Sequence, residues 1–226
     1  MAGILVESLL AKVPSVRFRL SSIEATEVDE RLVELLTSAP RQLSPYLHAP
    51  LQSGSDRILK RMGRHWYTAA TYRAAIENLS SRTSVFGLGA DIIAGFPGES
   101  DSDHAATIEL VSSLPFTSLH VFSYSPRPYT AALRLGERMP SDIVSARAAE
   151  LRMLARQKAL DYMQKRIAQS ADVIVTGAPV SGSGARLGLT QDYLTVQVAS
   201  ADPRGSRFDA RLEIAADTLR AIRINT

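Results

Sequence analysis

Short apolar runs and amphipathic, helix-like segments alternate through the first three quarters of the chain. The strand-like runs are residues 16–24, 47–52, 87–96 and 118–126, and the first three are each followed by residues with helical apolar spacing. In the first helix-like stretch, Thr26 stands where an N-cap is expected. Strand–helix repeats of this kind predict an α/β fold, with a parallel sheet covered by helices as an open sheet or as part of a barrel.

Each strand-like run ends in polar or glycine-rich residues: SSIE, QSGS, GFPGE and SPRP. Ligands of parallel α/β folds bind at the carboxyl ends of the strands, so we expect these four segments to line one mouth. Each motif also has a simpler interpretation. Gly95–Glu99 can be a tight turn rather than a passage for a flat ligand, and Ser53 or Ser55 can cap the next helix rather than hold a ribose or a carboxylate.

The last third of the chain has a different pattern. Residues 141–169 predict one long, strongly basic helix, with an apolar face that comprises Met153, Leu160, Met163 and Ile167. After residue 170, five short strand-like runs follow without an intervening helix, which predicts a small antiparallel β-barrel of the oligonucleotide-binding type. We therefore expect an α/β domain at 1–140, a connecting helix at 141–169 and a β-barrel at 170–226.

The chain contains no cysteine, which excludes disulfides, thiolate zinc sites and cysteine-ligated iron–sulfur clusters within these residues. The histidines, His48, His65, His104 and His120, show no ligand-type spacing, so we expect no metal site, and we expect His48 and His120 to be buried in the core. The net charge of +3 permits a nucleic-acid partner without requiring one. Because Glu7 and Lys12 interrupt the apolar start, we expect a soluble cytoplasmic protein without a membrane contact.

The order of the motifs is more specific than any one of them. RLSSIE, HAPLQSGSDRILKRMGR, DIIAGFPGES and HVFSYSPRP, followed by a tail that contains GLTQDYLTVQV, resemble the radical-SAM tRNA methylthiotransferases over essentially the whole chain. The similarity is greatest to the branch that modifies N6-threonylcarbamoyladenosine beside the anticodon. The resemblance implies part of a (β/α)₆ radical-SAM barrel followed by a TRAM domain, with S-adenosylmethionine and [4Fe–4S] clusters as cofactors and tRNA as partner.

The resemblance also implies roles for individual residues. The residues expected at S-adenosylmethionine are Ser22, Glu24, Gln52, Ser53, Arg64, Ile93, Gly95 and Glu99, of which Ile93, Gly95 and Glu99 belong to the segment that passes the adenine. Arg127 is expected at the rim that faces the substrate. Tyr129 replaces the usual glycine of the family, and it is expected either to fill part of the mouth or to forbid a positive φ.

The family holds its radical-SAM cluster with a CxxxCxxC loop, which this chain lacks. By position, the chain begins before the third barrel strand, so the resemblance implies a truncated barrel that is inactive alone, with a separate chain as one possible source of the N-terminal half. Two other interpretations stay open. One is a non-enzymatic RNA-binding remnant, for which Tyr193 and Phe208 are the aromatic candidates in the tail. The other is a different nucleotide-binding α/β enzyme, although the sequence contains neither a P-loop nor a GxGxxG motif.

Overall fold

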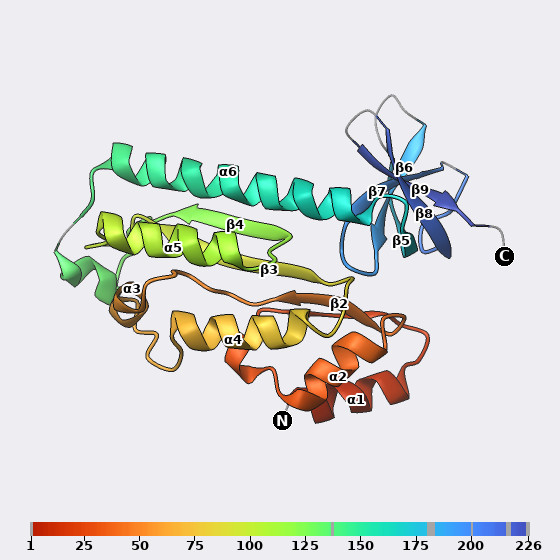
Figure 1. Cartoon of the computed structure of the whole chain (residues 1–226), viewed down its shortest axis with the longest axis horizontal. Helices are drawn as coiled ribbons and strands as arrows, with labels where there is room; N and C mark the ends of the chain where they lie inside the picture. The colour runs from red at the N-terminus through yellow and green to blue at the C-terminus, as the bar shows by residue number, and fades with distance from the viewer. Residues whose placement is uncertain (1, 137, 180–183, 200, 216–217, 225–226) are drawn as a thin grey trace.

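Four parallel strands form one sheet in the computed structural model, which describes residues 2–136, 138–179, 184–199, 201–215 and 218–224. The strands lie side by side in chain order (Figure 1): β1 (Phe18–Ser21), β2 (Leu43–His48), β3 (Gly87–Ala94) and β4 (Ser118–Ser123). The parallel sheet predicted from the strand–helix alternation is confirmed.

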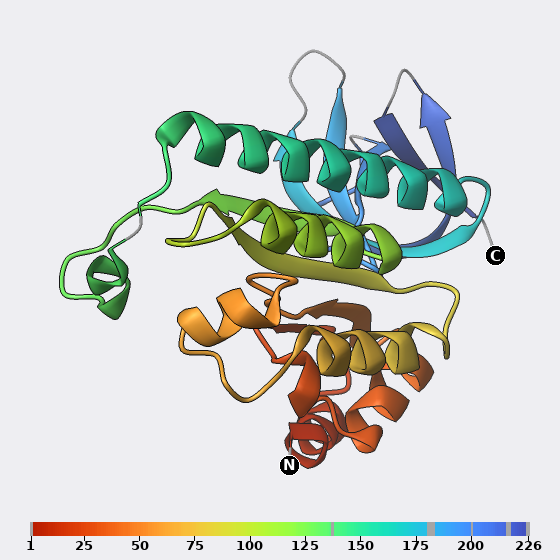
Figure 2. The ribbon, with the colours of Figure 1, turned by 60° about the vertical axis from the view of Figure 1, so that its left-hand side comes forward.

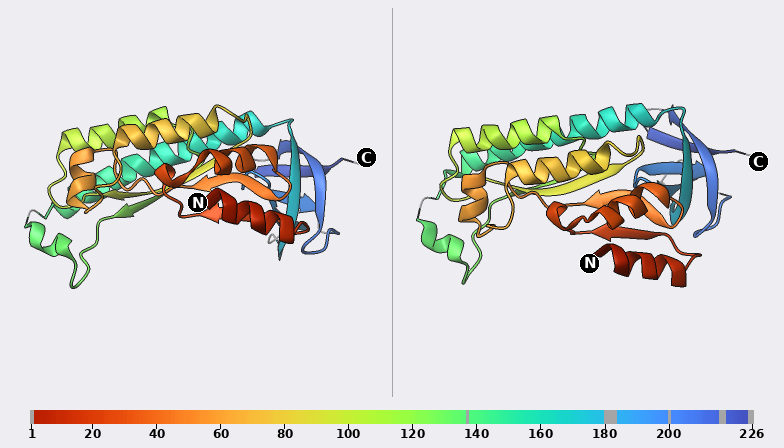
Figure 3. Two further views of the ribbon diagram at one scale, coloured as in Figure 1. Left: turned by 90° about the horizontal axis from the view of Figure 1, so that it is seen from below. Right: turned by 60° about the horizontal axis from the view of Figure 1, so that its bottom comes forward.

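Helices pack against one face of this sheet. They are α1 (Ala2–Lys12), α2 (Glu30–Ser38), α3 (Asp56–Arg61), α4 (Ala69–Ser80), α5 (Asp101–Ser113) and α6 (Ser141–Arg166). Helices α4 and α5 lie on the same side of the strands (Figure 3), and α6 runs alongside α5 (Figure 2). Leu88, Ala90 and Ile92 of β3 are fully buried in the core that these helices share. Because successive side chains of a strand point to opposite faces, Gly89, Asp91 and Ile93 face away from the helices.

Two boundaries differ from the sequence prediction. The second strand begins at Leu43 and ends at His48 instead of spanning 47–52. It ends before Pro50, which has no backbone N–H to donate, whereas Pro45 is accommodated inside the strand, where the register with β1 shifts. The helix α2 is capped by Asp29, whose carboxylate accepts from the Leu32 N–H at 2.9 Å, so the N-cap assignment to Thr26 is wrong. Thr26 lies instead in a 3₁₀ turn (Ala25–Glu27) that places Ala25 in the core.

The long helix α6 forms as predicted, but its predicted apolar face does not. Met153 is 68% exposed and Leu160 is 44% exposed. Ala148 and Leu151 are buried in the core of the sheet instead, while Met163 packs against the core of the β-barrel. The two ends of α6 pack against different cores, so the helix does not bury one continuous apolar face.

The tail forms a closed five-stranded barrel. Its strands are β5 (Ser170–Pro179), β6 (Ala185–Thr190), β7 (Thr195–Ala199), β8 (Arg207–Ala215) and β9 (Thr218–Arg223), in the order β5-β6-β7-β9-β8. The prediction of five strands is confirmed, but the barrel is not wholly antiparallel. Strands β7 and β9 run parallel, with Gln197 opposite Arg220. Within the described residues, no helix combines the length and the apolar character needed to cross a bilayer.

A buried ion pair joins α6 to the barrel. Arg166 at the end of α6 is 1% exposed, and its Nε lies 2.9 Å from Oδ2 of Asp192, whose side chain is fully buried. The hydroxyl of Tyr162 donates to the same carboxylate oxygen at 2.6 Å. Asp192 lies in the turn between β6 and β7, directly against Gly87 at the start of β3, where a side chain would have no room. The barrel is therefore docked at the amino ends of the parallel strands.

We predict that Asp192→Ala lowers the free energy of unfolding by about 3–5 kcal/mol, because it leaves the Arg166 guanidinium buried without its counter-charge. Urea unfolding followed by circular dichroism measures the change. The control is Arg73→Ala, which removes the exposed α4 pair with Glu77 and should cost less than about 0.5 kcal/mol. A loss for Asp192→Ala as small as that of the control would show that the pair does not hold the two parts together.

Candidate functional site

The carboxyl ends of the strands, together with α3, lie at the opposite end of the molecule from the barrel (Figure 1). A cleft of about 390 Å³ opens there. Three residues predicted to contact S-adenosylmethionine line it, namely Gln52, Arg64 and Ile93. The other lining residues are Lys60, Arg61, Met62, Gly63, Phe96, Thr130, Ala131 and Ala132. Segments after β2, β3 and β4 contribute to this cleft, whereas the SSIE segment after β1 does not line it.

The loop Gln52–Ser55 is clamped onto α5. Ser53 is 1% exposed, and its hydroxyl lies 3.3 Å from that of Thr107. The N–H of Gly54 donates to the same threonine hydroxyl at 2.9 Å, and a Cβ on Gly54 would lie 2.6 Å from the Thr107 Cα. Ser53 thus holds the loop against the helix, away from the cleft. Ser55 caps α3, as the simpler interpretation of this motif allowed.

Asp103 is the anchor of this clamp. Its carboxylate accepts from the Ser55 hydroxyl at 2.6 Å, from the Ser100 hydroxyl at 2.5 Å and from the Arg57 guanidinium. Burial raises the pKa of Asp103, but the hydrogen bonds from Arg57, Ser100 and Ser55 together outweigh burial and hold this pKa well below its usual range. The loop geometry therefore depends on an ionised Asp103.

Gln52 joins the loop to the sheet through its backbone. Its N–H donates to the Asp91 carbonyl at 2.8 Å, and its own carbonyl accepts from the Ile93 N–H at 3.0 Å. The residue has a φ of 66°, a left-handed conformation that is costly for a side chain with a Cβ. These backbone bonds stabilise that conformation while the side chain lines the cleft.

The GFPGE motif is a turn that is tied back to α6. Glu99 is 5% exposed, and its Oε2 accepts from the Gly95 N–H at 3.0 Å and from Nη1 of Arg147 at 2.8 Å. Gly95 has a φ of 75°, and a Cβ there would lie 2.6 Å from the side chain of Val144 in α6. Neither Gly95 nor Glu99 lines the cleft. The tight-turn interpretation describes both residues better than direct contact with a ligand.

Glu24 supports Arg64 from behind. Its Oε1 accepts from the Arg64 guanidinium at 2.8 Å, and its Oε2 accepts from the indole N–H of Trp66 at 2.9 Å. Ser22 lies elsewhere, in a second cleft on the uncovered face of the sheet. The predicted site residues are therefore divided between lining the cleft, supporting its walls and facing the second cleft.

The second cleft, of about 600 Å³, contains a group that sequence reasoning missed. His48, Asp91 and His120 offer ligand atoms that all lie within 4.8 Å of one another. His48 is buried, as predicted, but the prediction that His120 is buried is wrong, because its side chain is 61% exposed. The alternation of buried and accessible residues could have revealed this group, because each of the three residues lies on the row of its strand that faces away from the helices.

The rim after β4 carries the two remaining residues of interest. Arg127 is exposed, and its carbonyl accepts from the hydroxyl of Thr130 at 2.8 Å. Tyr129 is fully exposed and has a φ of 65°. Of the two expected effects of tyrosine in place of glycine, neither is present: the side chain does not fill the mouth, and the positive φ is retained.

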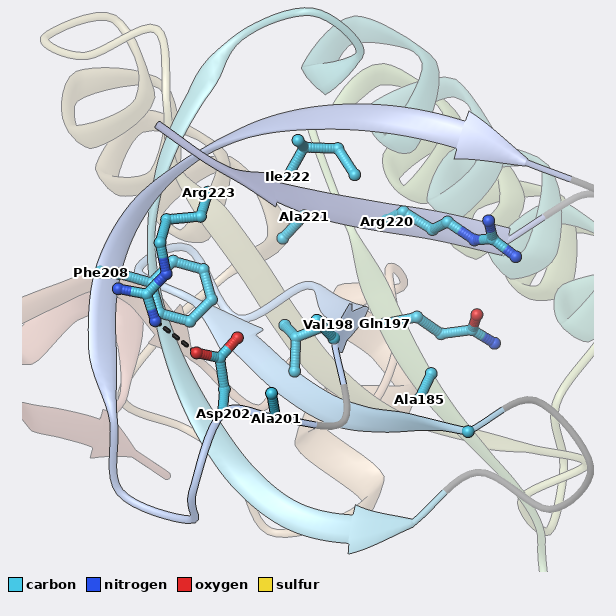
Figure 4. Close-up of a pocket in the computed structure, with 12 residues that line it drawn as sticks. Ala185, Gln197, Val198, Ala201, Asp202, Phe208, Arg220, Ala221, Ile222 and Arg223 are labelled. Atoms are coloured by element: carbon cyan, nitrogen blue, oxygen red, sulfur yellow. Dashed lines mark hydrogen bonds and ion pairs between the residues drawn. The ribbon is translucent and has the colours of Figure 1, made fainter. Parts of the chain in front are cut away.

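The β-barrel has a groove of about 650 Å³, in which the side chains of Gln197 of β7 and Arg220 of β9 extend in the same direction (Figure 4). The guanidinium of Arg223 lies over the ring of Phe208, 4.0 Å from the centre of that ring. Arg223 also forms an ion pair with Asp202. The ring of Tyr193 lies 4.8 Å from that of Tyr46, tilted by 39°, and the Arg19 guanidinium lies 4.1 Å from its centre, while the side chain is 39% exposed. Both aromatic candidates for base stacking are therefore already in contact with side chains of the same chain.

The residues of the cleft fit one of the two cofactors that the family implies. A volume of about 390 Å³, with Arg64 and Gln52 as polar groups and Ile93 and Phe96 as apolar ones, suits a small molecule with a charged end and a flat base. A [4Fe–4S] cluster does not fit, since the chain has no cysteine thiolate to hold it.

Comparison with known proteins places these features in a family. Residues 4–111 match the model of the Radical SAM superfamily. The threonylcarbamoyladenosine tRNA methylthiotransferase of Thermotoga maritima is 38% identical over 74% of this chain and 38% of its own length. The tRNA-2-methylthio-N(6)-dimethylallyladenosine synthases of Ehrlichia chaffeensis and Acidithiobacillus ferrooxidans are 36% and 34% identical, over 73% and 91% of this chain and 37% and 46% of theirs.

This chain belongs to the radical-SAM tRNA methylthiotransferase family. It spans less than half the length of the relatives that it matches. Among solved structures, the radical SAM enzyme coproporphyrinogen III oxidase from Escherichia coli aligns with 80% of this chain and 46% of its own, at 14% identity and a TM-score of 0.49.

We predict that Tyr129→Gly raises the free energy of unfolding by about 0.5–1 kcal/mol, because glycine adopts the observed positive φ without the steric cost that tyrosine bears. The comparison is Tyr193→Gly, which also relieves a positive φ, of 71°, but removes a ring stacked 4.8 Å from that of Tyr46. That variant should lose about 1 kcal/mol or more. Urea unfolding of both variants is the measurement, and destabilisation by Tyr129→Gly would contradict the account of the rim.

We predict that Asp103→Asn lowers the free energy of unfolding by about 2 kcal/mol at pH 6, through the loss of charge-assisted hydrogen bonds. The folded-state pKa of Asp103 lies below its unfolded value of about 3.9, so its stabilisation is complete above about pH 5 and is lost progressively as the pH falls toward the folded-state pKa. The gap between the wild type and the variant should therefore shrink between pH 5 and pH 2.5, as measured by urea unfolding, with the exposed Asp142→Asn as control. A gap independent of pH would contradict the role given to the carboxylate.

Proposed function

We propose that these residues form the binding portion of a methylthiotransferase that modifies C2 of N6-threonylcarbamoyladenosine beside the anticodon of tRNA. The observation that carries the proposal is the cleft at the carboxyl ends of the strands, which Gln52, Arg64 and Ile93 line, three of the eight residues assigned to S-adenosylmethionine. The motif resemblance in the sequence and the Thermotoga maritima relative at 38% identity support the threonylcarbamoyladenosine branch.

S-adenosylmethionine, when bound, supplies the adenosyl radical and the methyl group of this reaction class. In the proposed binding mode, the Arg64 guanidinium, held by Glu24, binds the carboxylate of S-adenosylmethionine. The side-chain amide of Gln52 serves the ribose hydroxyls, and Ile93 with Phe96 contacts the adenine. Ser53, Gly95 and Glu99 keep the loops in position without touching the ligand, and Arg127 extends from the rim toward the substrate.

These residues supply only part of what the proposed reaction needs. Without a cysteine they hold no cluster, so the cluster ligands must come from other residues, either of a longer chain or of another polypeptide. These residues alone are therefore expected to be inactive. Of the two aromatic candidates for a purely RNA-binding remnant, Phe208 is buried beneath the Arg223 guanidinium, whereas Tyr193 is 39% exposed. Binding of tRNA is assigned to cationic side chains such as Arg220 and Arg156, which are exposed.

We predict that the chain binds S-adenosylmethionine and that Arg64→Ala weakens this binding by about 10-fold or more, since a charged hydrogen bond contributes about 1.5–3 kcal/mol. Isothermal titration calorimetry at millimolar ligand is the measurement, with Arg73→Ala on the exposed surface of α4 as the control. Absence of binding by the wild type, or equal binding by Arg64→Ala, would overturn the assignment of the cleft. Binding of threonylcarbamoylated tRNA with an affinity that falls steeply as the salt concentration rises would separately support tRNA as the partner.

A further inference from the structure

Three neighbouring strands place three metal-ligating side chains on the uncovered face of the sheet. His48 comes from β2, Asp91 from β3 and His120 from β4. Asp91 is directly opposite His120 in the β3–β4 register, and His48 is opposite Gly89, two residues before Asp91. A Cβ on Gly89 would lie 2.8 Å from Nδ1 of His48, so glycine at this position leaves the space that the imidazole ring occupies.

The donor atoms converge on one point. Nε2 of His48 and Nδ1 of His120 each lie 3.2 Å from the same oxygen of Asp91, Oδ1. A zinc ion with bonds of about 2.1 Å holds tetrahedral ligands about 3.4 Å apart, so two of the three donor separations already have the required length. The third, between the two imidazoles, is at most 4.8 Å and closes by rotation of the exposed His120 ring.

From this geometry we infer that His48, Asp91 and His120 bind one divalent first-row transition metal ion, of the Zn²⁺, Co²⁺ or Fe²⁺ class. Two imidazoles and one carboxylate form a donor set that these ions prefer, whereas Mg²⁺ and Ca²⁺ prefer oxygen ligands. Three protein ligands leave at least one coordination position for water or a small ligand from the cleft of about 600 Å³, which Arg19 and Ser118 also line.

This site is separate from the cleft assigned to S-adenosylmethionine. Asp91 lines the second cleft and Ile93, two residues further along the same row of β3, lines the first. A bound ion would therefore lie closer to the amino ends of the strands than the proposed cofactor does, between that cofactor and the β-barrel. Its binding requires neither S-adenosylmethionine nor tRNA, so its test is independent of the proposed function.

The test uses the chain without a histidine tag, freed of metal by a chelator and titrated with Co²⁺. We expect one equivalent to bind, with ligand-field absorption bands between 500 and 650 nm, and Zn²⁺ to displace it with one-to-one stoichiometry in calorimetry. His120→Ala should weaken the binding by about 100-fold or more, since loss of even an outer-shell partner costs 10- to 100-fold. The side chain of His120 is 61% exposed, so this variant is expected to fold, and circular dichroism verifies that it does.

The matched control is His65→Ala, which removes an exposed histidine outside the group and should bind Co²⁺ as the wild type does. Asp91→Asn is the second variant, which keeps the shape of the side chain but removes its charge and should also abolish the absorption bands. Absence of one-to-one binding by the wild type, or binding by His120→Ala equal to that of the control, would overturn the inference.

Discussion

Leu88, Ala90 and Ile92 of β3 are fully buried against the helices, so the residues between them are directed to the other face of the sheet. This alternation, imposed by the pleat, is the constraint on which both clefts depend. Because the helices of the described residues cover one face of the sheet, the row that contains Asp91 and Ile93 stays partly accessible. The same pleat places His48 and His120 on that face from the neighbouring strands.

Buried charged groups hold the loops at the carboxyl ends of the strands, beside apolar residues such as Leu51 and Ala94 that are fully buried there. Asp103 holds the loop after β2, and Glu99 with Arg147 holds the loop after β3. Both carboxylates lie behind the loops, so the backbone that borders the cleft is fixed before any ligand arrives. Preorganisation of this kind reduces the conformational entropy that binding would otherwise cost.

The architecture was predictable because apolar periodicity reports directly on secondary structure. It revealed the parallel sheet, the helix α6 and the five strands of the barrel. It failed where tertiary packing decides the outcome: the two ends of α6 contact two cores, so the apolar spacing of Met153 and Leu160 has no buried counterpart. The parallel β7–β9 pair was also missed, because strand pairing is not encoded in the periodicity of single strands.

The site was predictable only in its location. The segments after β2, β3 and β4 border one cleft, but Ser22 after β1 faces another, and the direction of each side chain depends on what packs behind it. Ser53 and Glu99 are therefore supports, although their residue types suit a ligand. The group of His48, Asp91 and His120 spans three strands, and its convergence on one carboxylate oxygen follows from the register, which the spacing of histidines along the chain does not reveal.

The most direct test of the proposed function is mass spectrometry of tRNA nucleosides from cells that lack their own threonylcarbamoyladenosine methylthiotransferase. The chain is expressed alone or together with a cluster-bearing N-terminal half of a relative. The account predicts 2-methylthio-threonylcarbamoyladenosine only when both parts are present, and loss of the product when Arg64→Ala replaces the wild type. Product from the cysteine-free chain alone would contradict the account, and so would methylthiolation of dimethylallyladenosine instead.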